Sequence, residues 1–451
     1  MTKQEIIQKI KDSQHSKVKF AVADIDGILR GKIISKEKFF EVIEKGVGFC
    51  DVIFGWDTND ACYNNVSYTG WHSGYPDVDV FFDLSTFRTI PWDNELPFFL
   101  ADLSGTDKKD TVCPRSLLKK IINQSESLGF RPIFSLEYEW FNFLETAHSL
   151  EEKNFINLKP ITPGMFGYSV NRPSMYSGFF NDLFNYLEAF QVELEGLHTE
   201  TGPGVYEAAI RYDDALRAAD KAILFKQAVK EIAHRHGIIA SFMAKWNKQL
   251  PGCGGHIHQS LRDIAKDINL FFNENSTYKM SDVFQSYVAG QLYCLPQILP
   301  MYAPTINSYK RLTEGAWAPT TLTWGIDNRT TALRVINKNI NSSRLETRVP
   351  GADINPYLAI AAALASGLYG IQNNLKLTSA PTVGNAYNIK ENGVLPGSLE
   401  EATKKMKESG LANELFGEAF TKHFVETREW ECRQYASNVS VWELKRYFEI
   451  I

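Results

Sequence analysis

The sequence lacks most of the features that would place a chain outside the ordinary globular proteins. Its 451 residues include six cysteines but no CxxC pair, which favours reduced thiols over a disulfide framework or a thiolate zinc site. The formal net charge is −5, so no overall positive field favours nucleic acid as a partner. Internal repeats and low-complexity tracts are also missing. The length is sufficient for two or three packed domains.

Long hydrophobic runs are missing as well. The most apolar stretch, residues 357–371, is too short and too rich in Gly, Ala and Ser to span a membrane. Asn355 and Pro356 before it predict the N-cap and first turn of a buried helix. The N-terminal segment MTKQEIIQKIKDSQ is polar and helix-like, unlike a signal peptide. We therefore expect no membrane association and a cytoplasmic location.

The distribution of strand and helix patterns predicts two domains. Residues 1–103 contain short strand-like runs such as VKFAVADIDG and VDVFFDLSTF, separated by turn residues. A polar stretch, SGTDKKDT, precedes Pro114 and an amphipathic segment. The remainder alternates strand patterns (FSLEYEWFNF, RLETRV) with helical ones (AADKAILFKQAVKEIAHRHG). This mixture favours an antiparallel α+β fold, with a small β-rich domain at 1–108 and a large domain at 109–451.

Two glutamates alternate with apolar residues in SLEYEWF (135–141). Residues two apart in a strand point to the same face, so Glu137 and Glu139 would present adjacent carboxylates above a buried opposite face. An isolated ExE pair is typical of an exposed polar strand. Two carboxylates held side by side nevertheless repel each other unless a cation or a proton lies between them.

Three further clusters of charged residues or histidines occur in the same large domain. They are HTETGPGVYE (198–207), GCGGHIHQS (252–260) and SSRLETRVPG (342–351). Each alone is compatible with a polar strand face or a surface salt-bridge ladder. Together they offer mostly carboxylates with imidazole, a ligand set that suits Mg²⁺ or Mn²⁺ better than Zn²⁺. Their side chains of interest are Glu200, Glu207, His256, His258, Arg344, Glu346 and Arg348.

Arginines concentrate in the same part of the sequence and suit bidentate recognition of carboxylates and phosphates. They are Arg311, Arg329, Arg334, Arg344 and Arg348. Metal ions beside an arginine cluster are typical of phosphoryl transfer from a nucleotide. Because no GxxxxGK[ST] motif is present, metals and arginines would have to hold the phosphates.

The order of the motifs resembles that of the glutamine synthetase superfamily. SLEYEWF, HTETGPGVYE, GGHIHQSL, NSYKRL, DNRTTALRV and RLETRVPGADINPYLA follow one another as in that catalytic domain, most closely over residues 113–372. The pattern APTTLTWGIDNRTTALRV is most similar to glutamate–polyamine ligases of the γ-glutamylputrescine synthetase type. The resemblance implies a small N-terminal β-grasp-like domain and a large catalytic domain with a curved antiparallel sheet and helices. It also implies a ring-shaped homo-oligomer, with a dodecamer favoured and active sites between subunits.

The resemblance further implies roles for individual residues. One metal ion would be bound by Glu139, Glu200 and Glu207, and a second by Glu137, His256 and Glu346. Glutamate and the transferred phosphoryl group would contact Arg311, Arg329 and Arg348, with Gly252 in the glutamate-binding loop. ATP would contact His258, Ser260, Arg334 and Arg344. The cofactors would be ATP and two or three Mg²⁺ or Mn²⁺ ions.

The chemistry of such a ligase explains this set of residues. A glutamate γ-carboxylate is a poor electrophile, so ATP would convert it to γ-glutamyl phosphate, which an amine then attacks. Both steps gather negative charge that metals and arginines neutralise in a preorganised site. An alkylammonium resembles Lys, with a pKa of about 10.4, so an acidic group has to bind the cation and remove its proton.

The loop YKRLTEGAWAP (309–319) bears on the choice of amine. In ammonia-using members the corresponding loop carries a glutamate that helps to bind and deprotonate ammonium, and ungapped alignment places Trp317 there. An indole removes that carboxylate but offers a π-face to an alkylammonium; packing of the loop is the other interpretation. Glu314 could supply the missing charge. Asp57, or alternatively Asp60, is the candidate for an acid contributed by a neighbouring subunit.

We therefore expect an ATP-dependent ligase that joins glutamate to a primary amine, with a di- or polyamine such as putrescine favoured. One alternative is a true glutamine synthetase that uses ammonia and has a variant lid. A second is a catalytically silent relative with a structural or regulatory role. The complete set of expected metal ligands argues against the second alternative, because a silent protein has no need to hold these groups together.

Overall fold

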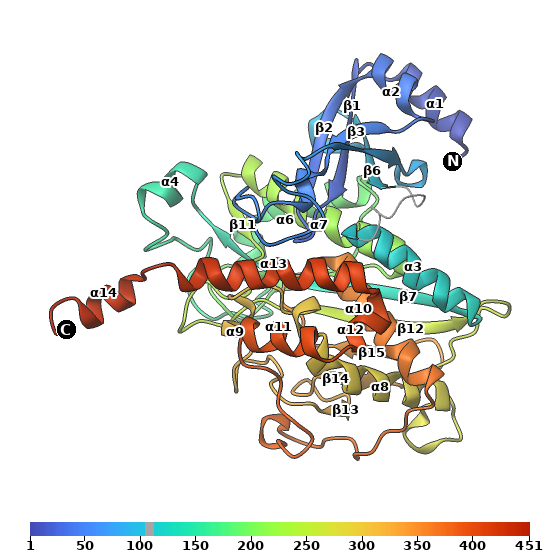
Figure 1. Ribbon diagram of the computed structural model, residues 1–451, viewed down its shortest axis with the longest axis vertical. Helices are drawn as coiled ribbons and strands as arrows, with labels where there is room; N and C mark the ends of the chain where they lie inside the picture. Colours follow the sequence, from blue (N-terminus) through green and yellow to red (C-terminus); the bar gives the residue numbers. More distant parts are fainter. Residues whose placement is uncertain (104–111) are drawn as a thin grey trace.

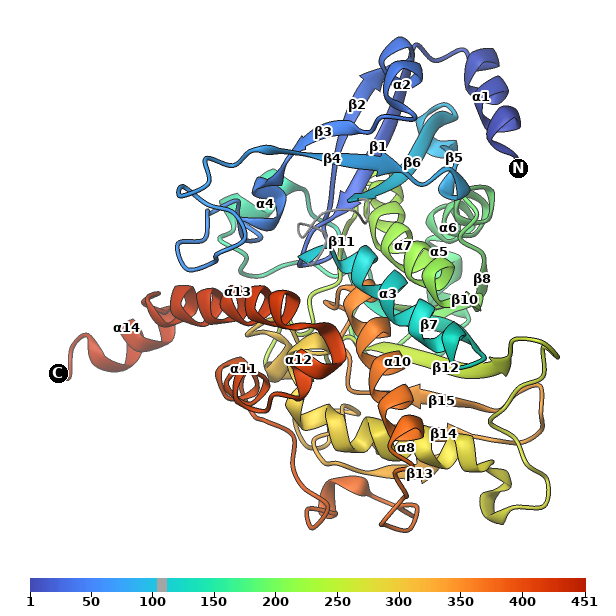
Figure 2. The same cartoon turned by 45° about the vertical axis from the view of Figure 1, so that its right-hand side comes forward.

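The computed structural model describes residues 1–103 and 112–451 and shows two sheets, each with its own apolar core (Figures 1 and 2). The expected domain boundary between residues 108 and 109 lies outside the described residues. Among the helices that the structure describes, none combines the length and the hydropathy that a bilayer span requires.

The N-terminal domain is a β-grasp-like unit, as expected. Its sheet has the order β2-β1-β6-β4-β3, with β5 paired to β6. The β1–β6 pair is parallel and the other pairs are antiparallel. Aromatic residues explain the packing, because Phe39 of the second helix contacts both Phe82 and Phe99 of the sheet. The elements are α1 (Lys3–Asp12), β1 (Lys17–Ala23), β2 (Leu29–Ser35), α2 (Lys36–Val42), β3 (Val47–Cys50), β4 (Asp77–Phe82), β5 (Arg88–Ile90) and β6 (Leu96–Leu103).

The large domain is built on a second sheet with the order β13-β14-β15-β12-β7-β9-β8, and β10 and β11 also pair with β7. The expected antiparallel arrangement holds except between β13 and β14, which run parallel. The strands are β7 (Phe130–Phe143), β8 (Leu194–Thr199), β9 (Val205–Ile210), β10 (Asp213–Asp214), β11 (Ile239–Ser241), β12 (Gly255–Asp263), β13 (Trp324–Ile326), β14 (Leu333–Ile336) and β15 (Arg344–Thr347).

Helices cover one face of this sheet and extend beyond it. α3, α7, α8 and α10 form the covering layer, and α13 and α14 run outward to the C-terminus (Figure 2). The helices are α3 (Pro114–Ser127), α4 (Ala147–Glu152), α5 (Asn171–Met175), α6 (Ser177–Ala189), α7 (Ala215–Arg235), α8 (Asp282–Cys294), α9 (Ser308–Arg311), α10 (Pro356–Gln372), α11 (Leu399–Glu408), α12 (Leu411–Phe416), α13 (Glu418–Ala436) and α14 (Val441–Tyr447).

Local sequence signals account for the main elements. α10 begins as expected, with the Asn355 side chain accepting the Tyr357 N–H and Pro356 in the first turn. In β7 the burial alternates along the strand, and Tyr138 and Trp140 pack on Phe225 of α7. Glu137 and Glu139 therefore point away from the helical layer, and the opposite face of the sheet carries the candidate site.

Candidate active site

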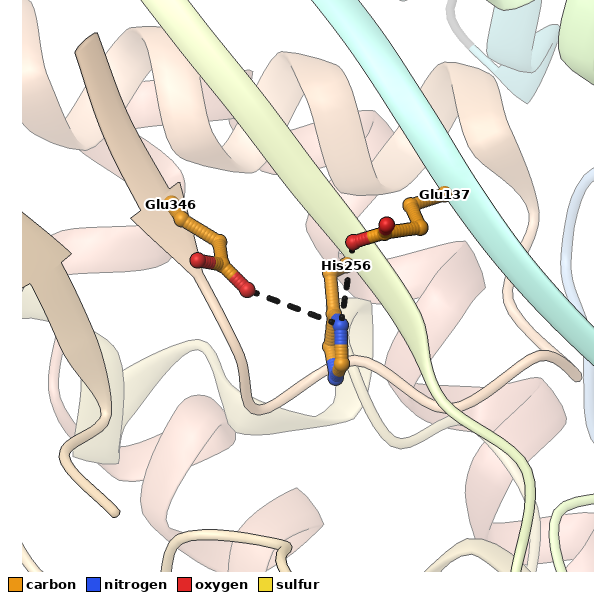
Figure 3. A group of neighbouring side chains, drawn as sticks. All are labelled: Glu137, His256 and Glu346. Atoms are coloured by element: carbon orange, nitrogen blue, oxygen red, sulfur yellow. Dashed lines mark ion pairs between the residues drawn. The ribbon is translucent and has the colours of Figure 1, made fainter. Parts of the chain in front are cut away.

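The register of the central strands brings one expected ligand group together. His256 of β12 is paired with Glu137 of β7, and Glu346 comes from the adjacent strand β15. The Nδ1 atom of His256 lies 3.6 Å from Oε2 of Glu137 and 3.6 Å from Oε1 of Glu346 (Figure 3). One potential ligand atom from each residue lies within 4.8 Å of the others. We call these three residues the His256 cluster.

The pKa values in the His256 cluster follow from its burial and its neighbours. Burial and, after it, the charge of Arg348 lower the pKa of His256 to about 4, so the imidazole is held in its neutral, metal-binding form. Burial opposes ionisation of Glu346, but the electrostatic effects of His258, Arg348 and Arg334 outweigh burial and lower its pKa to about 2. Glu137 is also kept ionised, because hydrogen bonds with His256 and His258 outweigh burial and lower its pKa.

A second acidic group lies on the neighbouring strands. Glu200 and Glu207 converge with His198, and one ligand atom from each lies within 4.8 Å of the others. Glu139 is directly opposite Glu207 in the β7–β9 pair. We call His198, Glu200, Glu207 and Glu139 the Glu207 cluster. Three of its four members were expected from the sequence.

Charge repulsion in the Glu207 cluster indicates a binding site for a cation. Burial and the carboxylates of Glu137, Glu139 and Glu200 raise the pKa of Glu207 to about 11. Burial also raises the pKa of Glu139, partly opposed by the charge of Arg311. A hard divalent cation would remove this penalty, and carboxylates with one imidazole are suitable ligands for Mg²⁺ or Mn²⁺. The residues present therefore fit the expected metals.

His198 is the member of the site that reasoning from sequence missed. Its Nε2 atom lies 3.3 Å from Oε1 of Glu207, and its ring stacks on Tyr168 with centroids 4.5 Å apart. The available signal was the alternation of His198 and Glu200 across the C-terminal end of β8, which places the two side chains on one face of the extended chain. The same i, i+2 rule had been applied to Glu137 and Glu139.

The glycines of GCGGH allow charged side chains to converge. The Gly254 N–H donates to Glu139 Oε2 at 2.8 Å. A Cβ atom at Gly254 would lie 2.8 Å from His256 Nε2, 3.0 Å from Arg311 Nη2 and 3.2 Å from Glu139 Oε1. A Cβ at Gly252 would lie 2.5 Å from the Ala244 carbonyl oxygen. Glycine is therefore required because of the close approach, without any need for a positive φ.

The residues expected on the nucleotide side line one cavity of about 590 Å³. The cavity extends from Glu137 of the His256 cluster to Arg262 near the C-terminal end of β12. Its wall also includes Asn341 and Ser343. Arg344 Nε lies 3.2 Å from His258 Nδ1, which fixes one side of the cavity. The expected residues that share this wall are His258, Ser260, Arg334, Arg344 and Arg329.

The arginines expected at the glutamate take different positions. Arg311 is buried and donates to the Val349 carbonyl oxygen at 3.0 Å. Arg348 is buried beside Glu346, and its Nε donates to the Arg329 carbonyl oxygen at 2.9 Å. Arg329 is exposed and lines the cavity, so its side chain lies with the nucleotide-side group.

The loop 311–319 has buried ends and an exposed tip. Arg311 and Ala318 are buried, whereas the Trp317 side chain is 64% exposed and its φ is +57°. Trp317 is therefore not packed into the described part of this chain. Glu314 is also exposed and forms an ion pair with Lys390 at 2.8 Å. The tip thus presents an indole face and a partly neutralised carboxylate to solvent.

Asp57 and Asp60 lie in a loop of the N-terminal domain. Asp57 Oδ2 accepts a hydrogen bond from Trp430 Nε1 of α13 at 2.8 Å. Asp60 forms an ion pair with Arg30 at 2.8 Å. Among the described residues, no hydrogen bond or ion pair joins either aspartate to the His256 or Glu207 cluster of its own chain.

The face of the sheet opposite the helical layer carries two acidic clusters beside an arginine-lined cavity. This combination is typical of enzymes that use a nucleotide and metal ions. The family comparison agrees. Residues 111–447 match the model of the glutamine synthetase catalytic domain, and the chain belongs to the glutamine synthetase family. It is accordingly an ATP-dependent ligase of that family, whose members use ATP and divalent metals.

Several curated relatives cover nearly the whole chain. A type-1 glutamine synthetase 2 of Dictyostelium discoideum is 55% identical over 99% of this chain and 86% of its own length. A glutamate–isopropylamine ligase of Pseudomonas is 38% identical (96% and 95% covered). A gamma-glutamylethanolamide synthetase of Streptomyces coelicolor is 35% identical (96% and 92% covered). A solved structure of GmaS with ADP shares the fold, with a TM-score of 0.85, 24% identity and coverage of 98% and 99%.

Proposed function

We propose that this ligase joins the γ-carboxylate of glutamate to a primary amine through γ-glutamyl phosphate, with a di- or polyamine such as putrescine favoured. The observation that carries the proposal is the exposed Trp317 in the loop where ammonia-using members have a glutamate. A π-face attracts an alkylammonium. The relatives that act on isopropylamine and that form a glutamylethanolamide show that the family includes ligases of small amines.

The site residues divide this reaction between two regions. Arg329, Arg334 and Arg344, with His258 and Ser260, would hold the ATP phosphates in the cavity of about 590 Å³. Bound Mg²⁺ or Mn²⁺ would neutralise phosphate charge at the two clusters. Arg311 and Arg348 would orient glutamate near Gly252. The preorganised positive charge lowers the barrier to phosphoryl transfer because no solvent has to reorganise.

The amine would enter from the side of the loop 311–319. It arrives as a cation and must lose a proton before it attacks. Glu314 is one candidate base, but its ion pair with Lys390 has to open first. Asp57 or Asp60 of a neighbouring subunit is the other, since in the described part of the chain their hydrogen bond and ion pair go to Trp430 and Arg30 and not to either cluster.

The expected assembly is a ring-shaped homo-oligomer, with a dodecamer favoured. The support is an exposed apolar C-terminal arm, residues 439–451, which projects beyond the body in both views (Figures 1 and 2). Val441 and Trp442 are each 61% exposed and Phe448 is 84% exposed. Apolar side chains at this density are costly in water unless another chain covers them.

Glutamine synthetase activity with ammonia is the second candidate, and the 55% identical type-1 glutamine synthetase favours it. Phosphate release with glutamate, ATP and Mg²⁺ should be measured with ammonium, putrescine, spermidine, ethylamine, isopropylamine and ethanolamine. We expect the highest kcat/KM with one of the alkylamines. A higher kcat/KM with ammonium than with all of them would overturn the amine-ligase proposal.

The metal assignment can be tested at Glu346. Glu346→Ala should lower kcat/KM by more than about 100-fold with every amine, because even residues around a metal ligand typically cost 10- to 100-fold. Asp327→Ala is a suitable control, since Asp327 also pairs with Arg334 but belongs to neither cluster. Retention of activity by Glu346→Ala would exclude this carboxylate as a required ligand.

A further inference from the structure

A group of polar side chains is buried on the helical side of the sheet, behind the His256 cluster. Gln259 of β12, Thr347 of β15, and Tyr287 and Gln291 of α8 are each at most 2% exposed. The surrounding layer is otherwise apolar. Buried amides and hydroxyls cost free energy unless they are hydrogen-bonded, so their partners need to be identified.

The side chains satisfy one another in a closed ring. Gln259 Nε2 donates to Thr347 Oγ1 at 2.8 Å, and this hydroxyl donates to Gln291 Oε1 at 2.8 Å. Gln291 Nε2 completes the ring by donating to Gln259 Oε1 at 2.7 Å. Tyr287 adds a hydrogen bond to the same oxygen at 2.8 Å. Because each of the three links joins a different pair of elements, the ring ties β12, β15 and α8 to one another.

The ring lies on the same two strands as two of the proposed metal ligands. Gln259 comes three residues after His256 along β12, and Thr347 follows Glu346 along β15, so the ring and these two ligands occupy opposite faces of the strands. The present register pairs His258 with Glu346. β15 spans only Arg344–Thr347 and pairs with β12 on one side and β14 on the other. A shift of β15 along β12 would move Glu346 relative to His256, and it would also break the hydrogen bond between Gln259 and Thr347.

The helix that holds the ring is itself closely fixed. A Cβ atom at Gly290 of α8 would lie 2.6 Å from the Gly370 Cα atom of α10. Gln291 Nε2 also donates to the Ala363 carbonyl oxygen of α10 at 2.9 Å. On the other face, Arg334 Nη1 lies 2.7 Å from one carboxylate oxygen of Glu346, and Arg348 forms an ion pair with the other oxygen. These contacts act on the side chain, whereas the ring constrains β15 from the helical side.

We propose that Gln259, Gln291 and Thr347 are positioning residues whose hydrogen-bond ring sets β15 against β12 and thereby preorganises Glu346 and His256 for a divalent cation. This inference rests on the proposed function, because it assumes that the His256 cluster binds a metal. It assigns to three side chains that contact no substrate a role in metal affinity at one of the two clusters.

The test compares Mn²⁺ binding by the full-length wild type and Thr347→Val, by isothermal titration calorimetry. Valine keeps the shape of threonine but removes the hydroxyl that accepts from Gln259 and donates to Gln291. Glu346→Gln identifies which class of Mn²⁺ sites belongs to the His256 cluster. We expect Thr347→Val to weaken that class about tenfold and to leave the other class unchanged. Thr347→Ser, which retains the hydroxyl, should restore wild-type affinity.

Thr421→Val is the matched control, because Thr421 is also a buried threonine, and its hydroxyl donates to the Ala412 carbonyl oxygen in the C-terminal helices, away from the sheet. Wild-type Mn²⁺ affinity in Thr347→Val, or the same weakening in both classes or in Thr421→Val, would overturn the inference. If Thr347→Val is not obtained folded, Gln291→Met breaks the ring from α8 and should weaken the same class. A wild type that binds no Mn²⁺ would overturn the proposed function together with the inference.

Discussion

Glu346 is the carboxylate of the His256 cluster that has two arginine partners. It is fully buried, it contacts Arg334 and Arg348, and its pKa is nevertheless about 2. A buried carboxylate normally resists ionisation, so the surrounding positive charge keeps it charged. The residue is thus available as an anionic ligand at any physiological pH.

At Trp317 the expected effect of substitution is modest and selective. Trp317→Leu should raise the KM for alkylamines about two- to fivefold, the equivalent of the 0.5–1 kcal/mol typical of an exposed cation–π contact, with little change in kcat. Trp317→Phe keeps a π-face and should stay close to the wild type. Steady-state kinetics with the preferred amine and with ammonium measure this. An equal effect of both variants would contradict a π-interaction.

The grouping of the candidate ligands could be predicted to the extent that strand alternation determines it. Glu137 and Glu139 follow from the i, i+2 rule, and the family motifs supplied Glu200, Glu207, His256 and Glu346. His198 was not predicted, because only the glutamates of residues 198–207 were considered as ligands. The exposure of Trp317 could not be predicted, since it depends on how the loop lies over the rest of the chain.

Among the elements, the loop that leads into β12 limits what can be substituted. Gly254→Ala should lower kcat/KM by on the order of 100-fold, because a methyl group would displace His256, Arg311 or Glu139 from its position. The free energy of unfolding should fall by about 1–3 kcal/mol, the typical cost of overpacking. Kinetics and urea unfolding should both be measured.

Gly178→Ala in α6 provides the comparison, since its Cβ would meet only His236 Cε1, at 3.7 Å. That variant should keep full activity. Comparable losses in the two variants would show that the loss of activity does not depend on the close contacts at Gly254.

Sequence patterns predicted strands and helices in the large domain, but they did not predict the parallel pairing of β13 with β14. The direction in which two strands pair depends on contacts between residues far apart in the sequence.

At the scale of the whole molecule, the C-terminal arm exposes apolar side chains that a neighbouring subunit would cover. A chain ending at Asn438 should form smaller assemblies than the full chain in light scattering, because it lacks the exposed apolar side chains of α14. Lys445→Ala, which leaves these side chains in place, should assemble normally. An unchanged mass of the shortened chain would remove this support for the ring.

The hydrogen bond between Asp57 and Trp430 holds a candidate acid away from the metal ligands of its own chain. If Asp57 acts in the active site of a neighbouring subunit, each active site contains residues of two chains. Two inactive variants can then complement each other. Asp57→Ala and Glu346→Ala, denatured, mixed in equal amounts and reassembled, should recover about a quarter of wild-type activity, since random assembly places both intact residues at that share of interfaces. Separately reassembled variants should recover none.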